Sequence, residues 1–288
     1  MTVEANAKIN LTLDILGRRD DGYHEVAMVM QSVGLFDTLR MESVPEGIAL
    51  RLDTADLPGD ERNLAWRAAR LFFDVHGLRC GVRIEIEKRI PIAAGLAGGS
   101  ADAAAVLRGM DALFETRMSD ADLSRLGAEL GSDVPFCLHG GTMLATGRGE
   151  ILTPLSPGLT AWVVLAKPPI EVSTAWAYRT FDEKVTAGRH RTPAMVRAIE
   201  EGKLAGIAAR VGNDLEAVTE IAHPVIGAYK QILVNHGALV SLMSGSGPTV
   251  YALTHDEETA QEAAAALVAA HPEAAVFVVP TVGAKELV

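Results

Sequence analysis

The chain has 288 residues, of which 49% are hydrophobic and 22% are charged, a composition typical of a globular protein and not of a disordered one. Its length allows one large domain or two modest ones. The formal net charge of -11 argues against a nucleic acid as partner, because neutralising a phosphate backbone requires an excess of lysine and arginine.

The two cysteines and the N-terminal residues indicate in which cellular compartment the protein is expected. Cys80 and Cys137 have neither CxxC spacing nor a histidine cluster nearby, so we expect no disulfide framework and no metal site built from them. The sequence begins MTVEANAKIN, without the basic and apolar stretches of a targeting signal, and no run of about eighteen apolar residues follows. We therefore expect a cytoplasmic protein with no membrane partner.

The first predicted elements are strands. Apolar residues alternate with polar ones from Ala7 to Ile15, which predicts a half-buried strand with Lys8 and Asn10 on its polar face. A charged, turn-rich loop, GRRDDGYHE, follows, and alternation around residues 39–52 predicts further strands of an antiparallel sheet. The pattern becomes helical from Asn63 to His76.

The middle of the chain predicts a strand, a glycine-rich loop and a helix. Residues 82–86 alternate, the segment PIAAGLAGGSADAA follows, and apolar residues then recur at helical spacing. Ser100 is a favourable N-cap for this helix. A second helix is expected to begin after Ser119, with a pattern similar to a capping box, and to stop at Gly131.

A second unit is predicted beyond about Thr153, which divides the chain into one domain over residues 1–153 and another over residues 154–288. Strand AWVVLA opens it, followed by helices capped by Ser173 and by Thr192. Its end reads as strand, tight glycine turn, strand, helix, strand. This order suits a split βαβ sheet with helices on one face.

Taken alone, the glycine-rich loop is a weak functional signal. Glycines let a backbone approach a ligand closely, and free N–H groups at a helix start attract phosphate. Most such turns, however, only need residues that tolerate positive φ. The loop contains neither GxxxxGK[ST] nor the full GxGxxG, so it is neither a P-loop nor a dinucleotide-binding fingerprint.

Three motifs in order resemble those of the GHMP kinase superfamily. The segment PIAAGLAGGSA at residues 91–101 is similar to its phosphate-loop motif, AKINL at 7–11 to its N-terminal motif, and MSGSGPTVY at 243–251 to its C-terminal glycine turn. Because the three motifs extend over nearly the whole chain, the chain is identified as a member of this superfamily. The resemblance implies an α+β fold of two lobes, with an N-terminal mixed-sheet lobe that binds ATP and a C-terminal split βαβ (ferredoxin-like) lobe on the substrate side.

Four further segments are similar to one branch of the superfamily. They are DGYHE at residues 21–25, NLAWRAA at 63–69, GSDVPF at 131–136 and NDLE at 213–216. The branch implies transfer of the γ-phosphoryl group of ATP to the 2-hydroxyl of 4-diphosphocytidyl-2-C-methyl-D-erythritol, giving the 2-phosphate and ADP. This is a step of the non-mevalonate (methylerythritol phosphate) route to isoprenoid precursors.

The phosphate loop departs from the family pattern at Ala94 and Ala97, which stand where many members have glycine. An alanine at positive φ would be strained, so we expect Gly95, Gly98 and Gly99 to supply the unusual backbone angles. The departures concern the detail of the loop and not the family.

Two charged residues are the candidates for catalysis. From the residues alone, Asp133 is most simply a turn former before Pro135, and Lys8 is either a solvated strand residue or a buried cation. The resemblance implies that Asp133 is the base that accepts the proton of the acceptor hydroxyl. It also implies that Lys8 is the electrostatic partner of Asp133.

The resemblance also implies a set of ATP-binding residues. Asn63, which could equally be only a helix cap, would contact the adenine, and Lys88 would frame the nucleotide. The full set is Asn63, Lys88, Pro91, Gly95, Leu96, Ala97, Gly98, Gly99 and Ser100. The hydroxyl of Ser100 could reach phosphate or metal, and no residue is firmly assigned as a metal ligand.

The implied substrate-binding residues are Asn10, Tyr23, His24, Asp133, Thr174 and Tyr178. Tyr23 and His24 could be ordinary surface residues, and Tyr178 beside Trp176 would ordinarily belong to the core. The resemblance places Tyr178 against the cytosine ring. We expect ATP and Mg²⁺ as cofactors and a small molecule with a cytidine diphosphate group as partner, and the oligomeric state is left open.

Two alternatives share the same motifs. A related kinase for homoserine, mevalonate or a sugar would not need DGYHE or an aromatic residue for cytosine. A catalytically silent regulator that only binds ligands would not need both Lys8 and Asp133, and both are present.

Overall fold

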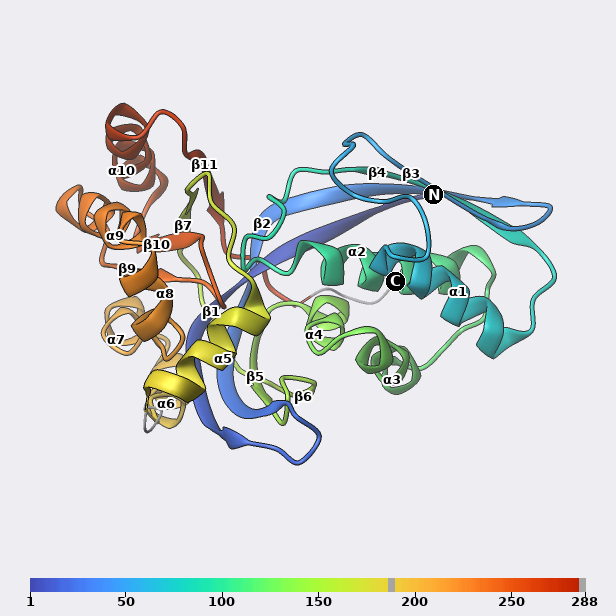
Figure 1. Cartoon of the computed structure of the whole chain (residues 1–288), viewed down its shortest axis with the longest axis horizontal. Helices are drawn as coiled ribbons and strands as arrows, with labels where there is room; N and C mark the ends of the chain where they lie inside the picture. The colour runs from blue at the N-terminus through green and yellow to red at the C-terminus, as the bar shows by residue number, and fades with distance from the viewer. Residues whose placement is uncertain (186–189, 285–288) are drawn as a thin grey trace.

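The computed structural model describes residues 1–185 and 190–284, which form two lobes, each built on its own sheet (Figure 1). The strands of the first sheet are β1 (Thr2–Arg18), β2 (His24–Val44), β3 (Ile48–Leu52), β4 (Gly81–Glu87), β5 (Thr142–Thr146), β6 (Ile151–Pro154) and β8 (Gly212–Asn213). They run in the order β3-β4-β2-β1-β8, with β5 paired to β2 and to β6. The pairs β3–β4 and β1–β8 are parallel and the others antiparallel, so the predicted mixed sheet is confirmed.

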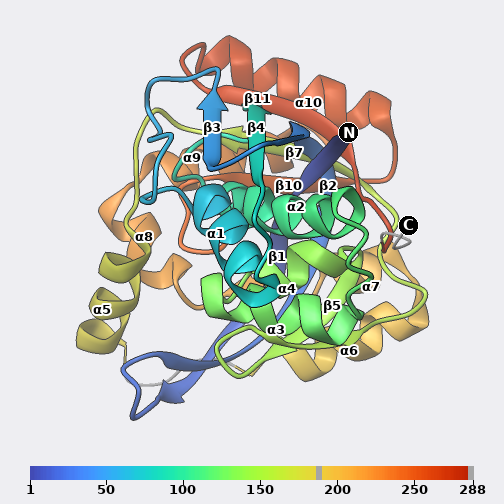
Figure 2. The same cartoon turned by 90° about the vertical axis from the view of Figure 1, so that its right-hand side faces the viewer.

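Helices pack on one face of this sheet, as Figures 1 and 2 show. They are α1 (Leu64–His76), α2 (Gly98–Leu113), α3 (Asp120–Leu130) and α4 (Val134–His139). Helix α2 contacts β1, β2 and the other three helices, so it forms the centre of this layer. Its alanines let it approach the sheet closely, and Phe72 and Phe136 fill the space beside it from α1 and α4.

The second sheet has the order β11-β7-β10-β9, with every neighbouring pair antiparallel. Its strands are β7 (Trp162–Lys167), β9 (Val240–Met243), β10 (Val250–Thr254) and β11 (Ala275–Pro280). Strands β10 and β11 lie parallel on either side of β7 and are joined by α10 (Glu257–Ala270), which is a split βαβ unit. Helix α9 (Val225–Asn235) packs on the same sheet, so the ferredoxin-like lobe is confirmed.

The remaining helices lie below the second sheet in the view of Figure 1. They are α5 (Thr174–Lys184), α6 (Thr192–Glu201), α7 (Leu204–Ala208) and α8 (Glu216–Ala222). Across the described ranges 1–185 and 190–284, no helix is both long and apolar enough to cross a bilayer. The cytoplasmic location expected from the sequence stays a prediction.

Strand β1 is buried on both faces, so the half-buried strand that the alternation predicts is wrong in this respect. Ile9 and Leu11 are fully buried on the apolar face, yet Lys8 is only 4% and Asn10 only 1% exposed on the other. Residues distant in sequence cover that second face: the carbonyl of Leu96 accepts from the Lys8 N–H at 3.1 Å. Alternation of polar and apolar residues therefore identifies the strand but not the burial of its polar side.

Most helix boundaries agree with the local signals. The side chain of Asn63 caps α1, that of Ser119 caps α3 and that of Ser173 caps α5, each by accepting a backbone N–H. The sequence predicts Thr192 as the cap of α6, but Thr192 is the first helical residue. Its N–H donates to Asp14 Oδ2 at 2.7 Å instead.

The division of the chain at residues 153 and 154 stays a prediction. These residues lie in β6, which pairs with β5 in the first sheet. Strand β8 comes much later in the chain and nevertheless pairs with β1. The second unit therefore contributes a strand to the first sheet.

Asn213 in β8 connects the two lobes through its side chain. Its Nδ2 donates to the carbonyls of Met243 and Gly245 at 2.9 and 2.6 Å, and its Oδ1 accepts the N–H of Leu215 at 3.0 Å. Its backbone lies beside Leu13 of β1. The NDLE segment thus ties the C-terminal glycine turn to the strand that carries Lys8.

The variant Asn213→Ala should lower the free energy of unfolding by about 2 to 4 kcal/mol, because it leaves two buried carbonyls without their donor. Chemical denaturation followed by circular dichroism measures this change. The matched control is Asn235→Ala, an exposed residue at the end of α9, which should cost less than about 0.5 kcal/mol. Equal effects of the two variants would contradict a linking role for Asn213.

Candidate active site

A cavity of about 1240 Å³ opens between the lobes. It is lined by β1, by the phosphate loop and the start of α2, by residues 132–133 before α4, by α5, and by the C-terminal glycine turn. The sequence-predicted residues that line it are Lys8, Asn10, Tyr23, His24, Lys88, Pro91, Gly95, Ala97, Gly98, Gly99, Ser100, Asp133, Thr174 and Tyr178. Asn63 and Leu96 are not among its lining residues.

The phosphate loop closes against the other lobe at Gly95. This residue has φ of 74°, and a Cβ added there would lie 2.2 Å from the carbonyl oxygen of Ser244. The hydroxyl of Ser244 donates to the carbonyl of Gly95 at 3.0 Å. Glycine is therefore required here for both the backbone angle and the close approach.

The other positive φ angles of the loop do not lie at the glycines that we expect to supply them. Ala93 and Ala97 themselves adopt positive φ, at 51° and 59°, whereas Gly98 and Gly99 are helical residues of α2. Ser100 is consequently inside the helix and not its N-cap, because α2 begins three residues earlier than its sequence predicts. Each alanine in this conformation costs on the order of 1 to 2 kcal/mol, which packing of the loop must offset.

Gly98 and Gly99 have different surroundings. A Cβ on Gly98 would lie 3.1 Å from Cγ2 of Ile90, so packing leaves little room for a side chain. Within the described ranges 1–185 and 190–284, a Cβ on Gly99 would meet nothing within 4 Å. Since Gly99 also lines the cavity, a side chain added there has open space around it.

Lys8 is a buried cation at the floor of the cavity. Its Nζ donates to Asn10 Oδ1 at 2.7 Å and to the carbonyl of Gly95 at 3.3 Å, and lies 3.6 Å from Asp133 Oδ2. A buried ammonium is costly unless its donors are satisfied and a negative charge is near. The surroundings of Lys8 provide both. The interpretation of Lys8 as a buried cation is therefore confirmed, and its interpretation as a solvated strand residue is wrong.

Asp133 occupies the cap position of α4, yet its side chain makes no capping hydrogen bond. The carboxylate is 30% exposed and contacts Lys8 at the cavity wall. The turn between α3 and α4 thus positions the carboxylate, but the carboxylate oxygens do not cap the helix. A carboxylate placed in this way can accept a proton from a bound hydroxyl.

Aromatic residues form the far end of the cavity. The rings of His24 and Tyr178 stack with centroids 4.7 Å apart and an interplanar angle of 29°. His24 Nε2 lies 2.8 Å from Asp182 Oδ1. Burial raises the pKa of the Tyr178 hydroxyl, and the negative charge of Asp133 adds to this effect, so Tyr178 remains neutral. Tyr23 is 54% exposed, so it is the more open of the two tyrosines at this end.

Several lining residues were missed by the sequence reasoning. The guanidinium of Arg148 lies 4.9 Å from the centre of the Tyr23 ring, and the hydroxyl of Ser246 lies 2.9 Å from that of Thr174. Ser246 belongs to the C-terminal glycine motif, so a signal for it was available. Arg148 follows a turn glycine in the segment TGRGE, and nothing in that pattern distinguishes it from an ordinary surface arginine.

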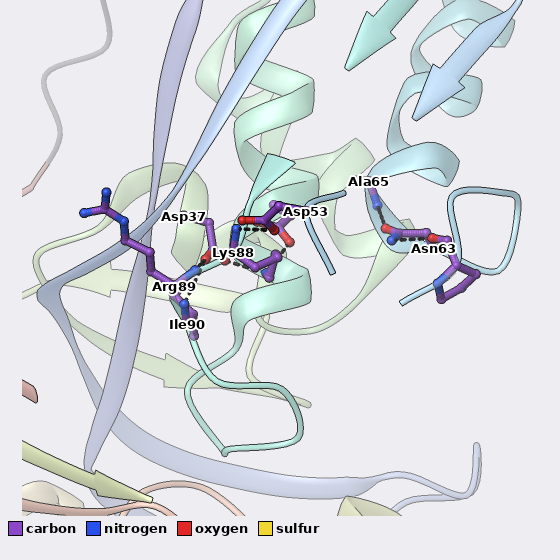
Figure 3. Close-up of polar contacts among 9 residues, drawn as sticks. Asp37, Asp53, Asn63, Ala65, Lys88, Arg89 and Ile90 are labelled. Carbon is purple, nitrogen blue, oxygen red and sulfur yellow. Dashed lines mark hydrogen bonds and ion pairs between the residues drawn. The ribbon is translucent and has the colours of Figure 1, made fainter. Parts of the chain in front are cut away.

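Lys88 and Asn63, which the sequence predicts to contact a nucleotide, both form polar contacts with other residues of the protein (Figure 3). Lys88 forms ion pairs with Asp37 at 2.5 Å and Asp102 at 2.6 Å. Asn63 Oδ1 accepts the N–H of Ala65 at 2.9 Å, which is the capping contact of α1. The next residue, Leu64, lines the cavity. The roles of Asn63 and Lys88 toward a nucleotide stay predictions.

Residues 63–141 match the GHMP kinases N terminal domain, and residues 195–273 match the GHMP kinases C terminal domain. The 4-diphosphocytidyl-2-C-methyl-D-erythritol kinase of Pelotomaculum thermopropionicum is 51% identical over 92% of this chain and 93% of its own length. The protein of the same name from Macrococcus caseolyticus is 48% identical over 91% and 93%.

Solved structures agree with the sequence comparison. A crystal structure of 4-(cytidine 5'-diphospho)-2C-methyl-D-erythritol kinase superimposes with a TM-score of 0.83 at 34% identity, covering 98% of this chain and 100% of the other. Homoserine kinase from Cytophaga hutchinsonii has a TM-score of 0.75 at 19% identity, over 99% and 96%, and shares the fold alone. With two domain matches and relatives near half identity over nearly the full length, this chain belongs to the GHMP kinases, in the family of 4-diphosphocytidyl-2-C-methyl-D-erythritol kinases.

Proposed function

We propose that this chain transfers the γ-phosphoryl group of ATP to the 2-hydroxyl of 4-diphosphocytidyl-2-C-methyl-D-erythritol. The products are the 2-phosphate and ADP, in the methylerythritol phosphate route to isoprenoid precursors. Relatives of that name at 43% to 51% identity support the assignment. The observation that carries it is the single cavity that holds the phosphate loop, the Lys8–Asp133 pair and the stacked His24–Tyr178 rings.

The proposed chemistry needs one proton acceptor and one fixed cation. The substrate hydroxyl attacks the γ-phosphorus, the bond from that phosphorus to the β-phosphate oxygen breaks, and the hydroxyl proton passes to Asp133. Lys8, held by Asn10 and Gly95, stabilises the oxygen as it loses its proton. Phosphoryl transfer depends mainly on alignment and charge stabilisation, so few protein side chains need to take part in the bond changes.

The nucleotide half of the cavity has the parts that a triphosphate requires. Backbone N–H groups at the start of α2 are free of intrahelical partners and favour anions. Gly99 brings the backbone to the cavity without a side chain in between. Leu57, Leu64 and Ile90 add an apolar wall, which suits an adenine ring.

Mg²⁺ belongs to the proposal as a partner of ATP. The described ranges 1–185 and 190–284 contain no group of three or more His, Cys, Asp or Glu side chains able to hold a metal. The oxygen donors that line the cavity near the loop, among them Ser100, fit an ion that is bound chiefly through phosphate oxygens. Such an ion supplies positive charge to the phosphates during transfer.

The substrate half suits a cytosine ring. His24 offers ring nitrogens for hydrogen bonds, and Tyr178 offers an apolar face that already stacks on His24. Homoserine or mevalonate would leave this aromatic end unfilled. Incubating the protein with ATP, Mg²⁺ and a panel of alcohols tests the choice, and phosphorylation of homoserine or mevalonate with the cytidylyl substrate ignored would contradict it.

The variant Asp133→Asn keeps the side-chain shape but cannot accept the hydroxyl proton. Turnover should fall by about 10²- to 10⁴-fold, while binding of ATP and of the alcohol changes little. Steady-state kinetics with both substrates measures this. Lys8→Met should cause a comparable loss, and the double variant should be scarcely worse than either single one because the two residues act together. Near-normal turnover of Asp133→Asn would reject the direct-base mechanism.

The variant Tyr178→Ala should raise the KM for the cytidylyl substrate by about 5- to 150-fold, since one stacking contact with a base is worth roughly 1 to 3 kcal/mol. The KM for ATP should stay unchanged. The control Tyr178→Phe keeps the ring and should behave nearly as the parent protein. If both Michaelis constants rise together, Tyr178 is a packing residue and the stacking aromatic lies elsewhere.

The variant Gly99→Val should weaken ATP binding by about tenfold or more, because its side chain enters the open space beside the phosphate loop. Calorimetry with a non-hydrolysable ATP analogue measures the affinity. The melting temperature should change little, whereas Gly98→Val should also lower it through contact with Ile90. Unchanged nucleotide affinity in Gly99→Val would refute the placement of the phosphates.

A further inference from the structure

Two buried carboxylates share one lysine beneath the phosphate loop. Lys88, directly after β4, has its Nζ 2.5 Å from Asp37 Oδ2 and 2.6 Å from Asp102 Oδ2. The exposed fractions of the side chains of Lys88, Asp37 and Asp102 are 7%, 0% and 4%. Asp37 comes from β2 and Asp102 from near the start of α2, so the cluster joins the sheet to the helix.

The cluster fixes the entrance of the phosphate loop. Asp37 Oδ1 accepts the backbone N–H groups of Arg89 at 2.5 Å and Ile90 at 2.8 Å, as Figure 3 shows. The Lys88 N–H donates to Asp53 Oδ1 at 3.0 Å. Residues 88–90 are therefore held by carboxylates on two sides.

The same cluster also reaches the exit of the loop. A Cβ on Gly98, the first residue of α2, would lie 3.6 Å from Lys88 Nζ and 3.1 Å from Ile90 Cγ2. Asp102 follows one turn later on the same helix and binds Lys88 directly. Both ends of the segment between Ile90 and Gly98 are thus tied to one buried ion cluster.

The charges within this cluster do not balance. Two carboxylates face one ammonium, which leaves one excess negative charge in a buried place when both are ionised. Asp102 Oδ1 is buried and, among residues 1–185 and 190–284, has no hydrogen-bond partner. An unpaired buried carboxylate oxygen is costly, and a proton on it removes the charge that causes the cost.

Burial raises the pKa of Asp102 to about 7, Lys88 opposes this shift, and the negative charge of Asp37 adds to it. Within the described ranges, the charged groups acting on Asp102 are Lys88 at the end of β4 and Asp37 on β2. As the pH falls through this range, the cluster takes up a proton and becomes neutral. As the pH rises, it gains a negative charge next to the place proposed for the triphosphate.

We infer that Asp37 and Asp102 are positioning residues of the nucleotide site: they hold the phosphate loop through Lys88, and Asp102 is protonated when the nucleotide is bound. Lys88 is then a structural cation of the loop and not a free phosphate ligand. Because ATP brings further negative charge, its binding favours the protonated cluster and draws a proton from solution. The inference rests on ATP binding at this loop, which is part of the proposed function.

The first test is proton uptake by the parent protein. Calorimetric titration with a Mg²⁺-bound, non-hydrolysable ATP analogue at pH 8, in buffers of different ionisation enthalpy, gives the number of protons taken up. At this pH the triphosphate is itself fully ionised, so uptake reports on the protein. A fraction of one proton is expected. Binding with no uptake would overturn the inference, whereas no binding at all would overturn the proposed function.

The second test removes the titrating group. Asp102→Asn keeps the shape and an oxygen for Lys88, so affinity for the analogue should lose its pH dependence. Between pH 7 and 8.5 the affinity of the parent protein should fall by a few-fold, with an upper limit of about tenfold per pH unit for one proton. A slope equal to that of the parent protein would overturn the inference.

The third test separates positioning from simple stability. Asp37→Asn weakens the hydrogen bonds that Asp37 accepts from the N–H groups of Arg89 and Ile90. The KM for ATP should therefore rise by about tenfold, and the KM for the cytidylyl substrate should stay unchanged. The matched control is Glu42→Gln, an exposed carboxylate on the same strand β2, which should leave both constants unchanged. If Asp37→Asn lowers only the melting temperature, the cluster is merely structural and the inference fails.

Discussion

The carbonyl oxygen of Gly95 is the point at which the three GHMP kinase motifs of this chain meet in space. It accepts from Lys8 Nζ at 3.3 Å and from the Ser244 hydroxyl at 3.0 Å. One peptide group of the phosphate loop is therefore bound both to the first strand and to the C-terminal glycine turn. A Cβ on Gly95 would lie 2.2 Å from the Ser244 carbonyl oxygen, so the lobes can meet here only because the side chain is missing.

This junction determines how exposed the two proposed catalytic side chains, Lys8 and Asp133, are to water. Once the loop and the turn cover β1, Lys8 loses contact with water and depends on Asn10, Gly95 and Asp133 for its hydrogen bonds and countercharge. Asp133 lies at the edge and stays 30% exposed. The cation is thus fixed in place while the carboxylate stays accessible, which suits a base that must receive a proton from a bound hydroxyl.

Local signals in the sequence predicted several elements of the fold correctly. Alternation identified β1, side-chain caps located the starts of α1 and α3, and the order of strands and helix near the C-terminus predicted the split βαβ sheet. Burial of the second face of β1 depends on Leu96, far along the chain, and could not be read from alternation. Pairing of Lys88 with Asp37, 51 residues away, likewise has no local pattern. The motif resemblance, and not periodicity, brought Lys8 and Asp133 together.

An acidic chain with a net charge of -11 has to attract phosphates by something other than an excess of lysines. The two lysines nearest the loop are each matched by carboxylates, Lys8 by Asp133 and Lys88 by two partners. Because these two charges are already paired within the protein, the N–H groups of the loop and of the first turn of α2 add to the attraction for an anion. Such dipoles act strongly only when their direction is fixed. The rigid attachment of the loop at both ends is therefore a requirement of binding an anion in a negatively charged protein.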